Sequence, residues 1–172
     1  MKTRVILSAA GSDRPGLTRS LAEAVLAAGG NWLESHLSRL GGRYVGSVLV
    51  EVDAERLAEF EAAVRSVDAS GLAVSLVAAG DAPAAAGEIL QLELVGQDRP
   101  GIVREVTTVL AELGVNIEDF VTTVENSAWS GEPLFRATAR LNILPGTTSE
   151  QVRSALEALS GEIMVDFNFA AP

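Results

Sequence analysis

Hydrophobic and polar positions in the first half of the chain follow two different spacings. Residues 4–11, RVILSAAG, form an apolar and partly β-branched run, which predicts a strand. The apolar positions that come next have helical spacing, which predicts a helix with one buried face: Leu17, Leu21 and Val25. The chain is therefore expected to begin with a strand and a helix.

The same half continues with a hairpin, a second helix and a closing strand. The pair Gly41-Gly42 lies between two extended segments, residues 31–40 and 43–52, and is typical of a tight hairpin turn. Apolar residues at helical spacing mark the second helix: Leu57, Phe60 and Val64. The run LAVSLVA over residues 72–78 predicts the last strand of this half.

The second half gives the same order of elements. A strand is predicted over residues 88–96, and a helix over apolar positions at helical spacing: Val106, Leu110 and Leu113. A later strand alternates apolar with polar residues, which predicts one packed face and one wetter face. Its apolar set is Phe135, Ala137, Ala139, Leu141 and Ile143.

The chain is expected to end with a helix and a strand. Thr148 and Gln151 have the spacing of a capping box at a helix start. The helix is marked by Val152, Leu156 and Leu159. In the closing strand, the residues predicted to point inward are Ile163, Val165, Phe167 and Phe169.

The two halves also repeat one another residue by residue. The segment GSDRPGLTRSLAEAVLAAGGN, residues 11–31, aligns without a gap with GQDRPGIVREVTTVLAELGVN, residues 96–116. Glycine, aspartate, arginine, proline and asparagine positions coincide, and so do apolar positions of the helix. Since an internal repeat determines the architecture, we expect two copies of one unit.

Each unit has the order β-α-β-β-α-β. Right-handed crossovers place both helices on one face of a four-stranded antiparallel sheet. The predicted fold class is α+β, with two ferredoxin-like domains over residues 1–80 and 88–172. The small residues of GDAPAAAG predict a linker over residues 81–87. The strand after the first helix is expected to lie beside the first strand.

The repeated turn DRPG has the chemistry of a helix start. Proline suits the first helical position, and glycine lets another backbone or a ligand approach closely. The first N–H groups of a helix lack partners within the helix and favour negative charge, so a carboxylate can dock there. The proposed contacts are the N–H groups near Pro15 and Gly16 and near Pro100 and Gly101.

Polar residues beside the turn can serve the other end of a zwitterion. Asp13 and Asp98 precede the helices, and they can cap them or receive an ammonium group. Asn31 and Asn116 start the following strands, and an amide offers both donors and an acceptor. These asparagines lie at the opposite end of the helix from the turn, so one copy need not bring the two together, and a neighbouring copy can supply the second half of a site. The simpler interpretation is that the turn is only a good helix start.

Composition limits the function classes. The formal net charge is −10, which argues against sequence-independent binding to DNA or RNA. The chain has no cysteine, and its one histidine, His36, is expected to be exposed or hydrogen-bonded on a strand near Glu34. No metal site, cofactor or catalytic group is predicted. The apolar run at the N-terminus predicts a strand and not a signal peptide, so a cytoplasmic protein without a membrane span is expected.

The segment DRPGIVREVTTVLAELGVNIEDF, residues 98–120, resembles the start of an ACT domain, a regulatory module that binds small molecules. Residues 13–35 resemble it nearly as well, although Trp32 stands where the family usually has an aliphatic residue. Two such domains together resemble the glycine cleavage system transcriptional repressor family. The resemblance covers almost the whole chain.

The resemblance implies that a free amino acid of the glycine or serine class binds at interfaces between ACT domains. The strand-helix turn of one domain and the asparagine region of a neighbour would supply the contacts. The candidate ligand-binding residues are Gly11, Asp13, Pro15, Gly16, Asn31, Gly96, Asp98, Pro100, Gly101 and Asn116. In that family, control is exerted through a protein partner, a transcriptional activator, and not by direct binding to DNA.

Two other function classes stay open at this point. One is an interaction or oligomerisation module that has lost its ligand. The other is a regulatory remnant of an ACT-containing enzyme such as a formyltetrahydrofolate deformylase, although no catalytic group supports it. The two copies are expected to pair through sheets or helices, within one chain or as a homodimer or higher oligomer. Trp129, in the long loop of the second copy, is the candidate partner contact.

Overall fold

The computed structural model describes residues 1–67, 71–80, 87–127, 131–159 and 163–169, the last four of these by their backbone. The chain divides into two compact units, Met1–Ala82 and Pro83–Pro172. Residues 81–86 of the predicted linker and Trp129 lie outside the described residues. In the described part of the chain, no helix has both the length and the apolar character needed to cross a bilayer.

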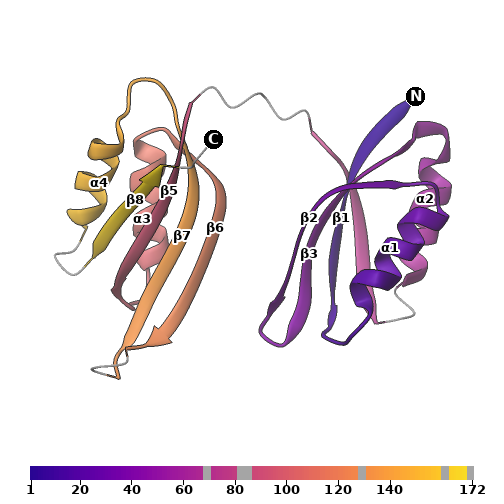
Figure 1. Cartoon of the computed structure of the whole chain (residues 1–172), viewed down its shortest axis with the longest axis horizontal. Coiled ribbons are helices and arrows are strands. Elements are labelled where there is room, and N and C mark those ends of the chain that lie inside the picture. Colours follow the sequence, from indigo (N-terminus) through magenta and orange to yellow (C-terminus); the bar gives the residue numbers. More distant parts are fainter. Residues whose placement is uncertain (68–70, 81–86, 128–130, 160–162, 170–172) are drawn as a thin grey trace. The chain divides into compact units, whose positions relative to one another are not determined.

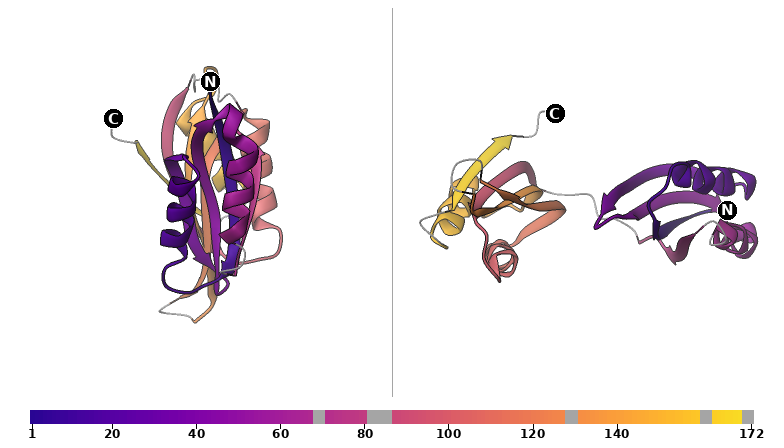
Figure 2. Two further views of the ribbon diagram at one scale, coloured as in Figure 1. Left: turned by 90° about the vertical axis from the view of Figure 1, so that its right-hand side faces the viewer. Right: turned by 90° about the horizontal axis from the view of Figure 1, so that it is seen from below.

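The first unit has four strands and two main helices (Figure 1). In chain order they are β1 (Lys2–Ser12), α1 (Leu17–Ala27), β2 (Asn31–Leu40), β3 (Arg43–Asp53), the 3-10 helix η1 (Ala54–Arg56), α2 (Leu57–Arg65) and β4 (Leu72–Ala78). The antiparallel sheet has the strand order β2-β3-β1-β4. Both helices cover one face of it (Figures 1 and 2).

The second unit repeats this topology. Its elements are β5 (Glu88–Gln97), α3 (Ile102–Glu112), β6 (Val115–Asn126), β7 (Pro133–Ile143), α4 (Ser149–Glu157) and β8 (Met164–Phe169). The strand order is β6-β7-β5-β8, again antiparallel. The predicted fold class, two ferredoxin-like α+β domains of β-α-β-β-α-β order, is therefore confirmed.

The position of the second strand in each unit differs from the prediction. We expected it beside the first strand, but β2 pairs with β3 and lies at the sheet edge, and β6 pairs with β7 in the same way. The β-α-β connection makes β1 and β2 parallel. In a sheet whose neighbours are all antiparallel, the returning hairpin strand β3 must therefore lie between them.

The cores follow the predicted periods. The apolar set of β7 is buried, with exposed fractions of 3% or less, while Arg136, Thr138 and Arg140 on the other face are exposed. Leu17, Leu21 and Val25 of α1 are buried in the same way in the first unit. Fully burying one such aliphatic side chain contributes about 1.5–3 kcal/mol to folding. Leu113, predicted on the buried face of α3, is only partly buried at the helix end.

The predicted hairpin turn and capping box are confirmed as well. Gly41 and Gly42 both have positive φ, 56° and 76°, as a two-residue hairpin turn of type I′ requires. Gly29 and Gly114 follow α1 and α3 with φ of 78° and 68°, so they end these helices in the left-handed conformation. Thr148 and Gln151 form a complete capping box at α4.

Candidate functional site

The strand-helix turns of the two units share one backbone geometry. Gly16 and Gly101 are the N-cap residues of α1 and α3, and both have φ of 93°. The Gly16 carbonyl accepts the first helical hydrogen bond, from Ser20 N–H at 2.9 Å, and the Gly101 carbonyl accepts from Glu105 N–H at 3.0 Å. No side chain caps either helix. The first N–H groups of both helices are therefore without a side-chain cap.

This geometry corrects one prediction about the turn and explains its glycine. The prolines do not occupy the first helical position, because the glycine after each is the cap and the helix begins one residue later. Glycine is required at both positions because the backbone there has a positive φ of 93°. A Cβ added at Gly16 would have no neighbour within 4 Å, and at Gly101 it would meet only Glu105 Oε1 at 3.9 Å.

The aspartates of the turn do not cap the helices. Asp13 pairs with Arg39 of β2, with 3.1 Å between Oδ2 and Nε. Asp98 is exposed, and its backbone N–H donates to the Pro133 carbonyl at 3.0 Å. The two aspartates thus have different surroundings although they share one place in the repeat.

The first turn is bordered by two shallow cavities of about 400 Å³ each. Arg14, Pro15, Gly16, Leu17, Arg19 and Ser20 line one of them. The other extends over Asp13 and Thr18 to Tyr44, whose hydroxyl lies 2.7 Å from the Thr18 hydroxyl. Arg14 forms no ion pair with any residue that the structure describes. The start of α1 therefore presents an uncompensated guanidinium beside uncapped N–H groups.

The second turn carries its own carboxylate. Arg99 donates to both oxygens of Glu105, from Nη1 at 2.7 Å and from Nη2 at 2.5 Å. These hydrogen bonds lower the pKa of the Glu105 carboxyl below its ordinary value, so it stays ionised. Glu105 lies in the first turn of α3, at the repeat position that Ser20 has in α1. The arginine that is unpaired in the first copy is neutralised in the second.

The candidate asparagines lie far from the turn of their own unit. Asn31 of β2 pairs with Glu51 of β3, which in turn pairs with Arg4 near the start of β1. The turn follows Ser12, at the other end of β1. Eight residues of strand separate these positions by roughly 26 Å. Asn116 is likewise level with the start of β5. One unit therefore does not bring its turn and its asparagine together.

The strand glycines before the turns are buried. A Cβ at Gly11 would lie 2.3 Å from the Gly71 carbonyl oxygen, so this glycine allows β4 to begin against β1. Gly96 is buried as well, opposite Phe135 of β7. The absence of a side chain at Gly11 therefore allows β1 and β4 to pack closely.

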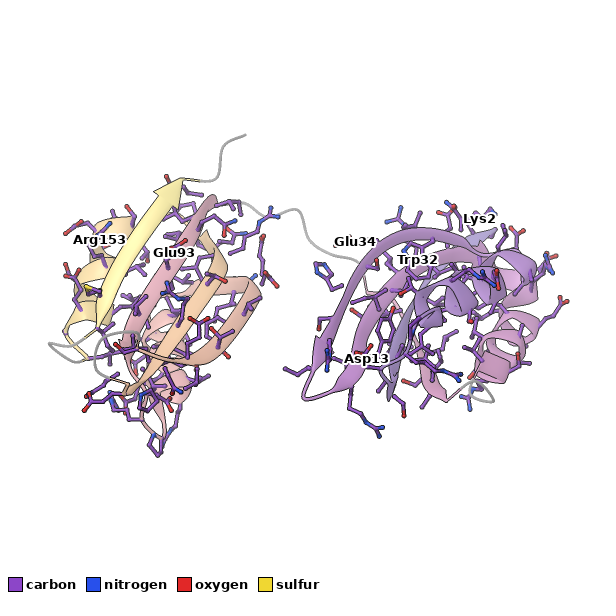
Figure 3. All side chains as sticks on the ribbon, turned by 60° about the horizontal axis from the view of Figure 1, so that its bottom comes forward. Lys2, Asp13, Trp32, Glu34, Glu93 and Arg153 are labelled. Atoms are coloured by element: carbon purple, nitrogen blue, oxygen red, sulfur yellow. The ribbon has the colours of Figure 1, made fainter. Side chains whose placement is uncertain are left out.

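The remaining candidate chemistry is structural. His36 Nε2 lies 3.1 Å from Glu34 Oε1, and both side chains are exposed on β2, as predicted. Trp32 is half-buried and packs against the core of the first unit; Figure 3 labels it together with Glu34 and Asp13. No group of three or more His, Cys, Asp or Glu residues suited to a metal ion occurs in the described ranges.

Sequence reasoning missed the residues that make the two turns unlike. They are Arg14, Ser20 and Tyr44 in the first copy and the Arg99–Glu105 pair in the second. The signal was present in the repeat alignment, because a serine and a glutamate coincide there at a first-turn position. The identical residues of the repeat drew attention away from this difference.

Comparison with known proteins agrees with the fold and the repeat. Sequence models of the ACT domain match residues 3–76 and residues 90–136. Among solved structures, an unknown protein from Galdieria sulphuraria has a TM-score of 0.83 and 28% identity over 99% of this chain and all of its own. A protein proposed to be a glycine cleavage system transcriptional repressor has a TM-score of 0.73 and 14% identity over 99% of both chains. No curated protein sequence matches the chain.

Proposed function

Because the chain belongs to the ACT-domain family, with one such domain in each half, we propose that it is a non-enzymatic regulatory protein that senses a small amino acid. The ligand is of the glycine or serine class, and the response passes to a protein partner. The observation that carries this proposal is the open start of α1, where an unpaired arginine stands beside uncapped N–H groups.

The chemistry of the first turn suits the carboxylate end of the ligand. The N–H groups after Gly16 and the helix dipole favour a negative charge. Arg14 adds a guanidinium, whose planar donors match a carboxylate. Ser20 lines one of these two cavities and Tyr44 the other, and their hydroxyls can hydrogen-bond a serine side chain. A glycine or serine carboxylate would be held here through donors alone.

The ammonium end requires acceptors from elsewhere. Asp13 borders the cavity, although Arg39 already pairs with it. Asn31 lies roughly 26 Å along the sheet in its own unit, so the amide that completes the site would come from a neighbouring domain. Ligand binding would thereby be coupled to domain association, which is how a binding event becomes a regulatory signal.

We assign the ligand to the first turn and not to the second. Glu105 places a carboxylate beside the start of α3 and occupies Arg99, so a ligand carboxylate would meet like charge there. For a ligand to bind at the second turn, the two charge-assisted hydrogen bonds between Arg99 and Glu105 would first have to break. In this assignment Pro100, Gly101 and Asp98 do not hold a ligand, because Arg99 beside them is paired with Glu105.

A reciprocal exchange of the two first-turn residues tests this assignment. Thermal shift against the twenty amino acids identifies the ligand, with glycine and serine expected to stabilise most, and calorimetry measures its affinity. Ser20→Glu should weaken binding at least tenfold, because it gives the first turn the carboxylate of the second. The matched control Glu105→Ser should bind at least as tightly as the wild type. Retained affinity in Ser20→Glu would contradict the assignment, and no stabilisation by any amino acid would favour the interaction module without a ligand.

The protein partner is proposed on charge and on structural likeness. The structural neighbour proposed to be a transcriptional repressor shares the fold, with a TM-score of 0.73 at 14% identity. The net charge of −10 disfavours direct binding to nucleic acid, so regulation through a protein such as a transcriptional activator is the consistent route. Affinity purification with and without the amino acid tests it: capture of an activator that changes with the ligand is expected.

A further inference from the structure

The face of the first sheet that points away from the helices is uncharged at its centre. We call it the outer face. The strand registers arrange its side chains in three rows across β4, β1 and β3. The large row is Val77, Ile6 and Leu49, the serine row is Ser75, Ser8 and Ser47, and the small row is Ala73, Ala10 and Val45. All nine side chains are exposed or half-buried.

The second unit does not share this property. Its corresponding sheet face carries Glu93, at the repeat position of Ser8, together with Arg136 and Arg140. Figure 3 labels Glu93 on its strand. In a chain with a net charge of −10, this uncharged centre of nine side chains, bordered on β2 by Glu34 and His36, is a candidate contact surface, because no partner has to desolvate a charge there.

The three rows are complementary to themselves under a two-fold rotation. An axis along the serine row places the large row of one copy over the small row of the other, and serine over serine. A shallow cavity of about 270 Å³ lies where the small row begins, lined by Ser8, Ala9, Ala10, Ala73, Val74 and Ser75. Under this rotation, Ile6 and Val77 of the second copy would enter it.

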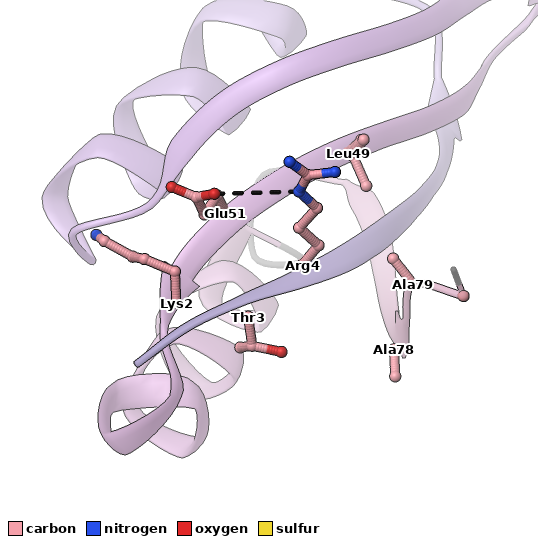
Figure 4. A pocket seen from close by; sticks show the side chains of 8 residues that line it. Lys2, Thr3, Arg4, Leu49, Glu51, Ala78 and Ala79 are labelled. Carbon is pink, nitrogen blue, oxygen red and sulfur yellow. Dashed lines mark ion pairs between the residues drawn. The ribbon is translucent and has the colours of Figure 1, made fainter. Parts of the chain in front are cut away.

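The charged rim follows the same symmetry. Glu51 lies one row beyond the large row, and Arg43 lies one row beyond the small row, both on β3. Within one chain roughly 26 Å separates them. Glu51 forms a loose ion pair, at 4.0 Å, with Arg4 (Figure 4). The rotation places Glu51 of each copy over Arg43 of the other, which gives two opposite-charge pairs.

We propose that the outer face of the first unit is the contact surface of a homodimer, formed by two copies packed face to face around the serine row. Between the Glu51 row and the Arg43 row the face measures roughly 26 Å along four strands about 4.8 Å apart, or roughly 500 Å² per copy. The total of roughly 1,000 Å² is at the lower bound for a specific protein–protein interface. This proposal does not depend on the amino-acid site, which lies at the turn.

Analytical ultracentrifugation of the full chain tests the dimer. Ser8→Glu places a charge on the two-fold row and should raise the dimer dissociation constant at least tenfold. The fold should accept it, since the second unit already carries Glu93 at that position, and thermal unfolding checks this. The control Glu93→Ser changes the matching position of the other sheet and should leave association unchanged. Equal association of Ser8→Glu and wild type would overturn the proposal.

A charge exchange tests the symmetry itself. Arg43→Glu alone opposes two glutamates across the interface, and Glu51→Arg alone opposes two arginines, so each variant should dimerise more weakly than the wild type. An equimolar mixture should recover dimers at wild-type strength, because each mixed dimer has two opposite-charge pairs. Recovery on mixing supports the face-to-face arrangement. Failure to recover, with both variants folded, overturns it.

Discussion

Gly16 and Gly101 determine the shape of both strand-helix turns. Each has φ of 93°, a conformation that costs a residue with a Cβ roughly 1–2 kcal/mol. Neither is crowded by described atoms, so the cost of substitution is almost entirely that of the backbone. A bulky substitution at either glycine would therefore report on helix geometry before it reported on ligand binding.

We expect Gly16→Ala and Gly101→Ala each to lower the free energy of unfolding by about 1–2 kcal/mol. Urea unfolding followed by circular dichroism measures it. Gly80 is the matched control, since it lacks a positive φ and a Cβ there would meet nothing within 4 Å. Gly80→Ala should be neutral or slightly stabilising, and a loss at Gly80 equal to that at Gly16 would contradict the backbone explanation.

The Arg99–Glu105 pair predicts a pH dependence of stability. The pKa of Glu105 is lowered in the folded state, so its contribution is present above the ordinary pKa of 4.5 and is lost as the pH falls through the folded value. Wild type should exceed Glu105→Gln in melting temperature near pH 7, and the gap should shrink as the pH falls below about 4. A gap that stays constant from pH 7 to pH 3 would argue against the ion pair as its source.

At the scale of elements, sequence periodicity predicted which face of a helix or strand is buried, but it did not determine which strands are neighbours in the sheet. The alternation of Phe135 to Ile143 identified the buried face of β7, because burial of one sheet face imposes a period of two. The edge position of β2 was missed, since a strand's own sequence does not state which strand lies beside it. The same limit applies to the turn, where Glu105 matters through Arg99, a contact that depends on helix geometry.

The capping box of α4 offers a test at this scale. Thr148 accepts from Gln151 N–H at 3.2 Å, and Gln151 Oε1 accepts from Thr148 N–H at 2.8 Å. Thr148→Ala should cost about 1 kcal/mol of stability. Ser154→Ala, an exposed change inside the same helix, should be neutral or slightly stabilising because alanine favours helix. Equal unfolding midpoints for the two variants would contradict a role for the cap.

At the scale of the whole molecule, charge decides which partners are accessible. A net charge of −10 repels a polyanion, and the described arginines mostly pair with carboxylates, as Arg140 does with Glu118 at 3.1 Å. We therefore expect no binding of the purified chain to duplex DNA at physiological salt. Fluorescence anisotropy with random-sequence duplexes checks this, and a nanomolar dissociation constant would refute it.

The carboxylate of Glu105 also determines the binding stoichiometry that the proposed function implies. Duplication produced two turns of one shape, and in the second of them the arginine is already paired with the carboxylate of Glu105. A single chain with the proposed function therefore takes up one amino acid, and its saturation curve is hyperbolic with a Hill coefficient of about one. A Hill coefficient above one would require coupling between chains. It would then depend on the degree of association, and therefore on protein concentration.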